Sequence, residues 1–281
     1  MNKPLLSIVI ANYNYGRFLE EAIQSVLSQS CNDYELIIVD GGSTDNSVEI
    51  IKKYEDKIAW WVSEKDKGQS DAFNKGFSRA KGRFLTWLNA DDILMPGALQ
   101  FFAAAVVKYP TCEWFVGGSL WIDKELKVIR CNRGRGFSVL RAKSGFVSVW
   151  GPSSFFTKEL YERAGRINEN FFYTMDSDLW YRFYFDCHVR YRCFATYVWG
   201  LRLHECAKMS GHNFMTTDEL KKAKHKWSVI ANERATMYLK VKPVHKLKWV
   251  FTLVGTKWGA AFMSRIDTKK FQKQHYMEMF K

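Results

Sequence analysis

The alternation of buried strands with helices in the N-terminal third of the chain is the feature that most constrains its fold. Four short runs are largely apolar and rich in β-branched or aromatic residues, as strands buried on both faces are: residues 5–11, 34–39, 58–62 and 84–88. Three segments between them have apolar residues at helical spacing or good N-cap residues: 18–29, 43–54 and 69–80. This order predicts a parallel sheet with right-handed crossovers.

Polar and acidic residues follow three of these strands at the point where each strand ends. Asn12 and Tyr13 come after the first strand, Asp40 after the second, and residues 89–92 (NADD) after the fourth. In sheets of this kind, ligands bind outside the carboxyl ends of the strands. We therefore expect the three groups to converge at one edge of the sheet.

The remainder of the chain is less periodic. We expect strands near 113–117 and 126–130, followed by a basic stretch over 130–143 and the segment 150–156. A helix is expected over 158–164, and another is opened by Asp176 and Asp178. No phosphate-binding loop, dinucleotide fingerprint, zinc-protease motif or nucleophile elbow occurs. Recognition of a nucleotide would therefore depend on carboxylates and a metal ion.

Asp91 and Asp92 are the strongest chemical signal. Two adjacent acids at the end of an apolar strand do not both enter a core, because burying an unpaired charge is costly. Carboxylates suit Mg²⁺ or Mn²⁺, which one or two of them hold together with substrate phosphates. The alternative is a helix N-cap, since Pro96 lies just downstream, and Asp40 could likewise be a strand-end cap.

Four segments resemble, in order and spacing, the family 2 glycosyltransferases of the GT-A fold: SIVIANYNYGRFLEEAIQSVLSQ, YELIIVDGGSTDNS, EKDKGQSDAFNKGF and GRFLTWLNADDILMPGAL. The similarity covers residues 4–110, is looser over 145–210 and is absent beyond about 215. It implies an α/β GT-A domain, with a central, mostly parallel sheet flanked by helices, over residues 1–215. Residues 1–110 would form the nucleotide-sugar half and 111–215 the acceptor half. Residues 216–281 would be a basic helical tail.

The resemblance also implies a donor site formed by Ala11, Asn12, Tyr13, Asp40, Asp71, Asn74, Asn89 and Asp91. Within it, Asp40 would bind the uracil of a UDP-sugar and Tyr13 could stack on the base. Asp91 would face the ribose, and Asp92 would hold Mn²⁺ or Mg²⁺ on the diphosphate, with Asp91 beside it. His204 would complete the metal site, although a lone histidine is as often structural.

Two residues depart from the pattern of the family. Gly41 stands where a second acid usually follows Asp40, and Asn89 stands where many relatives have the first Asp of D-x-D-D. Both departures leave the expected metal ligand in place. They bear on which donor is bound.

The segment FFYTMDSDLWYRF resembles the family motif E-D-x-D-L-W-x-R, which carries the general base. Asp176 matches the catalytic acid, and Asp178 is its rival. Acids enriched at a helix N-terminus would explain either residue without chemistry. The chemistry implied is one direct displacement with inversion at the anomeric carbon. The membrane spans and the Q-x-x-R-W motif of processive synthases are absent, so we expect addition of a single sugar.

The net charge of +13 belongs to the C-terminal part of the chain. Residues 1–120 hold 12 Lys/Arg and 15 Asp/Glu, whereas residues 219–281 hold 15 and 4. The tail could be an ordinary helix on the catalytic domain, but 247–263 is suited to lie in an anionic membrane surface. We expect a cytoplasmic protein with reduced cysteines, peripheral on the inner membrane face, whose acceptor is a glycan or a lipid-linked saccharide of surface-polysaccharide assembly.

Two other functions compete with this interpretation. The basic tail with its tryptophans would suit a nucleic-acid-binding protein, but no nucleic-acid-binding motif accompanies it, so we expect no nucleic acid partner. A nucleotidyltransferase would share the sheet and the paired acids. It would usually have a Gly-rich, basic loop after the first strand, where this chain has Asn12, Tyr13 and Asn14.

Overall fold

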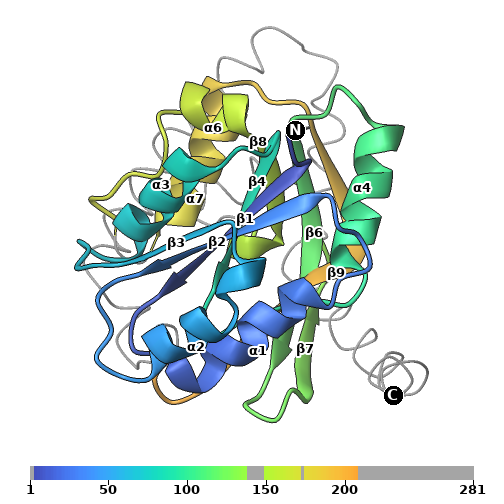
Figure 1. Ribbon diagram of the computed structural model, residues 1–281. Helices are drawn as coiled ribbons and strands as arrows, with labels where there is room; N and C mark the ends of the chain where they lie inside the picture. The colour runs from blue at the N-terminus through green and yellow to red at the C-terminus, as the bar shows by residue number, and fades with distance from the viewer. Residues whose placement is uncertain (1–2, 138–148, 172–173, 208–281) are drawn as a thin grey trace, which may run out of the picture.

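The computed structural model describes residues 3–137, 149–171 and 174–207. Its N-terminal half alternates strands and helices as predicted (Figure 1). The elements are β1 (Leu6–Asn12), α1 (Gly16–Leu27), β2 (Tyr34–Asp40), α2 (Ser47–Lys53), β3 (Trp60–Ser63), α3 (Gln69–Arg79) and β4 (Phe84–Asn89), with a short 3₁₀ turn at Glu55–Lys57. The four strands are parallel and lie in the order β3-β2-β1-β4.

The second half extends the same sheet beyond β4. Its elements are β5 (Ile93–Leu94), α4 (Ala98–Lys108), β6 (Trp114–Ile122), β7 (Val128–Asn132), a 3₁₀ turn (Gly151–Ser153), β8 (Ser154–Thr157), α6 (Lys158–Arg163), α7 (Met175–Tyr181), a π-helical turn (Arg182–Asp186) and β9 (Tyr191–Arg202). The order continues as β8-β6-β9-β5, with β7 paired to β6. The β8, β7 and β5 pairings are antiparallel, while β6 and β9 are parallel.

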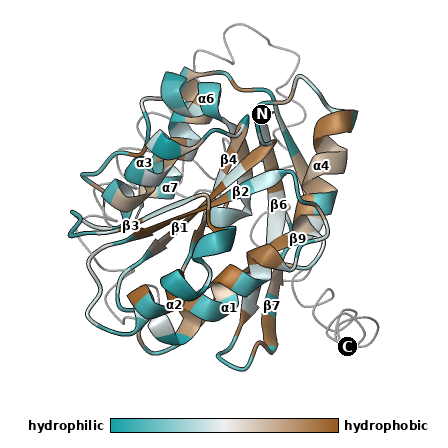
Figure 2. Ribbon diagram, in the orientation of Figure 1, coloured by the Kyte–Doolittle hydropathy of each residue, from teal (hydrophilic) through white to brown (hydrophobic). Residues whose placement is uncertain are grey.

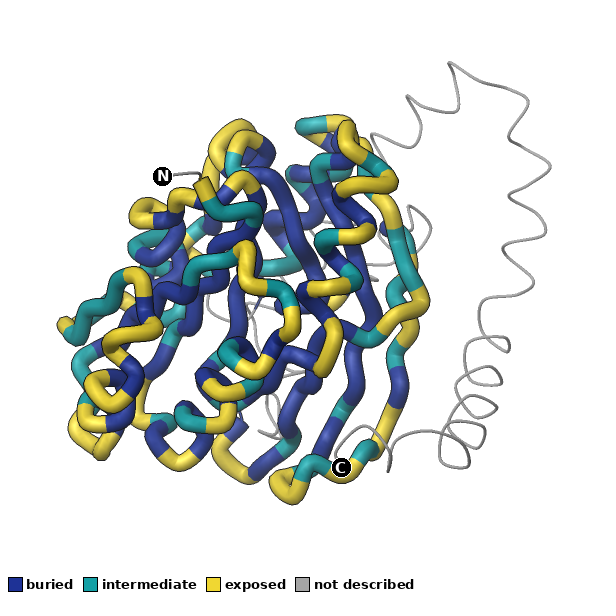
Figure 3. Tube along the Cα trace, turned by 45° about the vertical axis from the view of Figure 1, so that its right-hand side comes forward, coloured by how far each residue is buried: buried dark blue, intermediate teal, exposed yellow. Residues whose placement is uncertain are grey.

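Helices cover both faces of the sheet, so each central strand is buried on both sides (Figures 1 and 3). On β1, Ile8 and Ile10 belong to the core shared with α1, α2 and α4, whereas Val9 belongs to the core shared with α3, α6 and α7. The apolar colour of the strands beneath more polar helix surfaces shows the same arrangement (Figure 2). Burying one such side chain contributes roughly 1.5–3 kcal/mol.

No helix within the described residues is long and apolar enough to cross a bilayer. The expected boundary near residue 215 and the basic tail lie outside the described residues.

Candidate active site

The ends of β1, β2 and β4 lie side by side, as the sequence predicts. In the strand register, Asn12 is the partner of Asp40, and Ala11 is the partner of Asn89. The polar residues that follow these strands therefore meet at one edge. Ala11 is half-buried there, between β2 and β4.

Asp40 is the most deeply buried acid at this edge, with no exposed surface. Its Oδ1 accepts hydrogen bonds from Asn12 Nδ2 (2.6 Å) and Ser43 Oγ (2.5 Å), and its Oδ2 accepts from the Ser43 N–H (2.9 Å) and Ser63 Oγ (2.6 Å). Burial acts to raise the pKa of Asp40, but these hydrogen bonds outweigh it, and the pKa lies below its ordinary value. A carboxylate offers about four acceptor positions, and all are used. In this geometry Asp40 organises the turn after β2, and its contact with a base stays a prediction.

Tyr13 lies at the same edge with its side chain 58% exposed. Its loop is held against the turn after β2: the Asn14 N–H donates to Ser43 Oγ (2.8 Å), and the Thr44 N–H donates to Asn14 Oδ1 (2.8 Å). Asn14 has a left-handed backbone (φ 55°), which lets the loop turn back sharply. The ring of Tyr13 is therefore free to stack on a planar ligand.

Asp92 points into the protein rather than out of the site. It is 1% exposed; Oδ1 accepts the Arg202 N–H (2.9 Å) and Oδ2 accepts Asn89 Nδ2 (2.7 Å). Burial, together with the charge of Asp91, raises the pKa of Asp92 well above its usual range. An amide at position 89 suits this place because it donates to Asp92 while its oxygen accepts from Gln69 Nε2 (2.7 Å). In this geometry Asp92 braces the turn, and its role as a metal ligand stays a prediction.

Asp91 is the more exposed acid of this turn, and it pairs with the buried His204. The carboxylate is 17% exposed, and its Oδ2 lies 3.1 Å from His204 Nε2. The imidazole ring is enclosed by Tyr15 and Phe18, and Arg17 Nη2 lies 3.2 Å from its Nδ1. Because a guanidinium only donates, Nδ1 accepts, and a neutral His204 carries its proton on Nε2, which donates to Asp91.

A carboxylate and an imidazole at this edge fit a divalent cation that substrate phosphates complete. Within the described residues no group of three or more His, Cys, Asp or Glu side chains could hold a metal alone. One or two protein ligands plus phosphates are nevertheless typical for nucleotide-bound cations. Coordination by His204 Nε2 would require its proton to move to Nδ1 and the half-exposed Arg17 to turn away. The nitrogen ligand makes Mn²⁺ a better fit than Mg²⁺.

Helix α7, which carries both candidate bases, is fixed to the sheet by a stack of tryptophans. Trp180 lies between Trp87 of β4 and Trp114 of β6, with ring centroids 5.4 and 5.2 Å apart. All three rings are fully buried. The stack holds the N-terminus of α7 against the sheet.

Asp176 is half-buried at the first turn of α7 and has no ion-pair partner among the described residues. Its Oδ2 accepts the Gly151 N–H (3.2 Å), and its Oδ1 accepts the Ser177 N–H (2.6 Å). Burial raises the pKa of Asp176 above its ordinary value. Trp199 lies near both acid sites: its ring is 3.9 Å from where a Cβ on Gly151 would lie, and its side chain lies beside Asp92.

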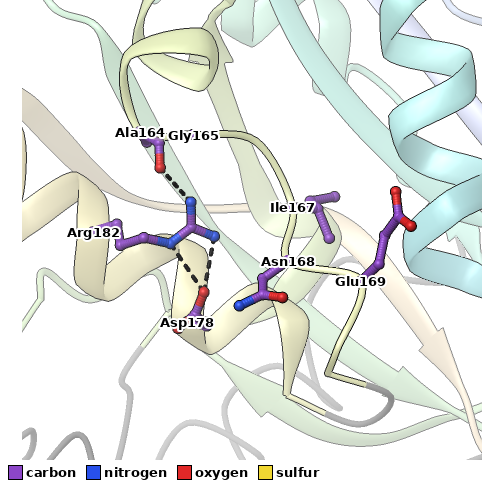
Figure 4. Close-up of a pocket in the computed structure, with 7 residues that line it drawn as sticks. All are labelled: Ala164, Gly165, Ile167, Asn168, Glu169, Asp178 and Arg182. Carbon is purple, nitrogen blue, oxygen red and sulfur yellow. Dashed lines mark hydrogen bonds and ion pairs between the residues drawn. The ribbon is translucent and has the colours of Figure 1, made fainter.

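Asp178 has a different environment, because residues two apart on a helix point to opposite faces. It is buried, and its Oδ2 lies 2.9 Å from Arg182 Nε and 2.8 Å from Arg182 Nη2. Arg182 also donates to the carbonyls of Ala164 and Arg166. This ion pair lines an open hollow of about 480 Å³ (Figure 4). The pairing gives Asp178 a structural role and favours Asp176 as the base.

The two expected donor-side residues of α3 do not join this group. Asp71 Oδ2 accepts the Lys67 N–H (3.0 Å) and closes the loop before the helix. Asn74 donates to Ile167 O and Glu169 Oε1 (both 3.0 Å) and accepts from Ile167 N and the Tyr161 hydroxyl. Every hydrogen-bonding position of the Asn74 amide is thus used to tie α3 to the segment after α6. Contact between Asn74 and a donor stays a prediction.

Sequence reasoning did not identify Arg202, which is central to the Asp91–Asp92 turn. Its buried guanidinium donates to Asp91 O (2.8 Å) and Lys124 O (3.3 Å) and pairs with Glu21 Oε2 (2.5 Å). The signal available was its position two residues before His204 in LRLHE, at the end of an unpredicted strand.

Comparison with known proteins shows similarity to glycosyltransferases. Residues 7–117 match the family model for glycosyl transferase family 2. An uncharacterized glycosyltransferase of Nostoc sp. is 46% identical over 34% of this chain and 30% of its own length. A Campylobacter jejuni protein named GalNAc(5)-diNAcBac-PP-undecaprenol beta-1,3-glucosyltransferase is 30% identical over 69% of this chain and 65% of its own length. The chain thus spans less than two thirds of these curated relatives.

Solved structures with the same fold have little sequence identity to this chain. Staphylococcus aureus TarS 1–349 in complex with UDP-GlcNAc is 16% identical, with a TM-score of 0.59 over 87% of this chain and 78% of TarS 1–349. A mannosyltransferase from Pyrobaculum calidifontis, in complex with GDP-Man and Mn²⁺, is 14% identical. Its TM-score is 0.58 over 95% of this chain and 85% of the mannosyltransferase chain. Residues 7–117 therefore belong to glycosyl transferase family 2, and the described residues have the GT-A fold of these glycosyltransferases.

Proposed function

We propose that the chain transfers a single sugar from a UDP-sugar to a hydroxyl of a glycan or lipid-linked saccharide, with inversion at the anomeric carbon. The observation that carries the proposal is the placement of two partly exposed acids in the GT-A fold. Asp91 is paired only with His204 at the carboxyl edge of the sheet, and Asp176 lies half-buried without a cationic partner among the described residues. The neighbouring acids Asp92 and Asp178 are both bound by protein donors.

The proposed reaction is one displacement. Asp176 accepts the proton of the acceptor hydroxyl while that oxygen forms a bond to the anomeric carbon and the bond from this carbon to the diphosphate oxygen breaks. The electron pair leaves with UDP, and Asp176 later releases its proton to solvent. A raised pKa makes Asp176 a stronger base than an ordinary aspartate, and general-base catalysis typically contributes about 10²–10⁴-fold.

The diphosphate end of the donor would lie at Asp91 and His204. When bound there, a divalent cation supplies positive charge to the departing diphosphate. Attack from the side opposite the diphosphate inverts the configuration, so an α-linked donor yields a β-linked product. The Campylobacter relative is named for a β-linkage and for an undecaprenol-linked substrate, which supports a lipid-linked acceptor here.

The test is an assay of purified protein with Mn²⁺ and a panel of UDP- and GDP-sugars, first for slow donor hydrolysis and then with undecaprenyl-diphosphate-linked saccharides. We expect UDP release from one UDP-sugar and a β-linked product by NMR. Release of inorganic pyrophosphate would instead indicate nucleotidyl transfer. Retention of the donor's anomeric configuration would contradict the single displacement.

A further inference from the structure

Gly41, at the end of β2, provides space that another carboxylate fills. A Cβ built on Gly41 would lie 2.7 Å from Asp66 Oδ2 and 3.1 Å from its Cγ. The backbone at Gly41 does not have the left-handed conformation that favours glycine, so the residue is needed for space and not for its φ. The position that usually carries a second acid is therefore occupied by a carboxylate from the loop after β3.

That loop is held close to the end of β2. The Glu64 N–H donates to Asp40 O (3.0 Å), and Ser63 is the strand partner of Asp40. A Cβ on Gly42 would lie 3.3 Å from the Lys65 nitrogen. The backbone thus presents Asp66 beside the same turn that Asn14 approaches from the loop of Tyr13.

Asp66 differs from Asp40 in having an acceptor to spare. All four acceptor positions of Asp40 are used and the residue is fully buried. Asp66 is half-buried; its Oδ1 accepts the Gly68 N–H (2.8 Å), and its Oδ2 has no hydrogen-bond partner within the described residues. The nearby Lys75 is paired with Glu64 (2.7 Å).

We propose that Asp66 selects the nucleobase of the donor, with its carboxylate accepting the ring N–H of a uracil (N3) or a guanine (N1). This inference rests on the proposed use of a nucleotide-sugar. An ionised carboxylate only accepts hydrogen bonds, so it suits a ring nitrogen that carries hydrogen. Cytosine and adenine present a lone pair at the corresponding ring nitrogen and leave the carboxylate unpaired, which a site of this kind rejects strongly.

The test is calorimetric titration of the full chain with UDP, GDP, CDP and ADP in the presence of Mn²⁺. We expect UDP or GDP to bind at least about tenfold more tightly than CDP and ADP. Asp66→Asn, whose amide can also donate, should weaken the preferred nucleotide about tenfold or more and reduce its preference over CDP. The matched control is Glu64→Gln, which removes the same charge from the same loop and should retain the wild-type preference.

A second variant moves the carboxylate instead of removing it. Gly41→Asp combined with Asp66→Ala places an acid back at position 41 and should restore preference for UDP or GDP over CDP. The inference would be overturned if Asp66→Asn kept the wild-type nucleotide preference. It would also be overturned if wild-type protein bound CDP as tightly as UDP and GDP. Absence of binding by wild-type protein to any of the four nucleotides would instead contradict the proposed function itself.

Discussion

Two aspartates only two residues apart on α7 have different surroundings, on which we base their proposed roles. Asp178 is paired with Arg182, so its charge is neutralised inside the protein. Asp176 has only hydrogen bonds from Gly151 and Ser177, and burial raises its pKa. An unpaired, partly desolvated carboxylate is more basic, which is what proton abstraction requires.

Asp176→Asn should lower turnover by at least about 10²-fold while donor affinity remains nearly intact, since a base acts in the transition state. The same change should leave the melting temperature at pH 7 unchanged or raised, because the amide removes a charge whose burial is unfavourable. Initial rates, UDP titration and thermal unfolding measure the three effects. A larger loss of turnover in a folded Asp178→Asn variant would exchange the two roles.

The pH dependence of activity should also identify Asp176. Because its pKa is raised in the folded protein, the protonated form persists above the ordinary aspartate value of about 3.9. We therefore expect kcat/KM to fall on acidification, with an apparent pKa above that value. The contribution of Asp176 to the free energy of unfolding should decrease as the pH rises through the same range. A pH–rate profile for wild-type protein that stays flat down to about pH 4 would contradict the assignment.

At the strand-end edge, the sequence predicted which side chains come together but not which way each one points. When two acids are adjacent in a turn, the sequence pattern does not tell which of the two side chains points inward. The inward turn of Asp92 depends on the Arg202 N–H, more than a hundred residues away. The same holds for Asp40, whose full set of hydrogen bonds depends on Ser63 of the neighbouring strand.

Among the elements, β9 connects the acidic turn to α1 and to the turn between β6 and β7 through Arg202. The guanidinium is 1% exposed and lies over the ring of Phe18 at 4.8 Å, while its partner Glu21 is half-exposed. The charge is thus stabilised by backbone carbonyls as much as by the ion pair. Its function is to position the backbone of Asp91.

Arg202→Lys should lower the free energy of unfolding by roughly 1–3 kcal/mol, since a lysine cannot make all of these hydrogen bonds and leaves buried acceptors unpaired. It should also weaken Mn²⁺-dependent UDP binding through misplacement of Asp91. Urea unfolding measures the free energy of unfolding, and calorimetry measures UDP binding. The control is Arg163→Lys, a more exposed pair with Glu113, for which we expect a change within about 1 kcal/mol. If Arg202→Lys kept the stability and the UDP affinity of the wild-type protein, this role of Arg202 would be contradicted.

The parallel half of the sheet was predictable because each strand is a continuous apolar run between amphipathic helices. The helix α4 was missed because its core segment FFAAAVV is apolar on nearly every side, so that no period distinguishes a face. Strand β9 was missed because only its second half is continuously buried, through pairing with β6 and β5. Such pairing is decided by distant strands and leaves little local signal.

For the whole molecule, the uneven distribution of charge predicts where the protein acts. Residues 219–281 carry 15 Lys/Arg against 4 Asp/Glu, and they lie outside the described residues. Each cation near anionic lipid contributes roughly 1 kcal/mol, and a lipid-linked acceptor would reside at that surface. A membrane-bound tail would therefore bring the site to its acceptor.

We expect the full chain to co-sediment with phosphatidylglycerol-containing vesicles at low salt and to dissociate at high salt, because screening weakens the attraction. A 1–240 truncation, which removes the aromatic segment 247–263, should sediment less. Phosphatidylcholine vesicles serve as the uncharged control. Equal sedimentation of both forms with anionic vesicles would show that this segment does not bind the membrane.

The central proposal is that the edge formed by β1, β2 and β4 binds a nucleoside diphosphate through a cation at Asp91. Calorimetric titration of UDP into the protein, with Mn²⁺ and with EDTA, tests it directly. We expect binding by wild-type protein in Mn²⁺, and loss of about tenfold or more in affinity both with EDTA and in a folded Asp91→Asn variant. Unchanged UDP affinity in Asp91→Asn, or the same affinity with and without the metal, would contradict the assignment.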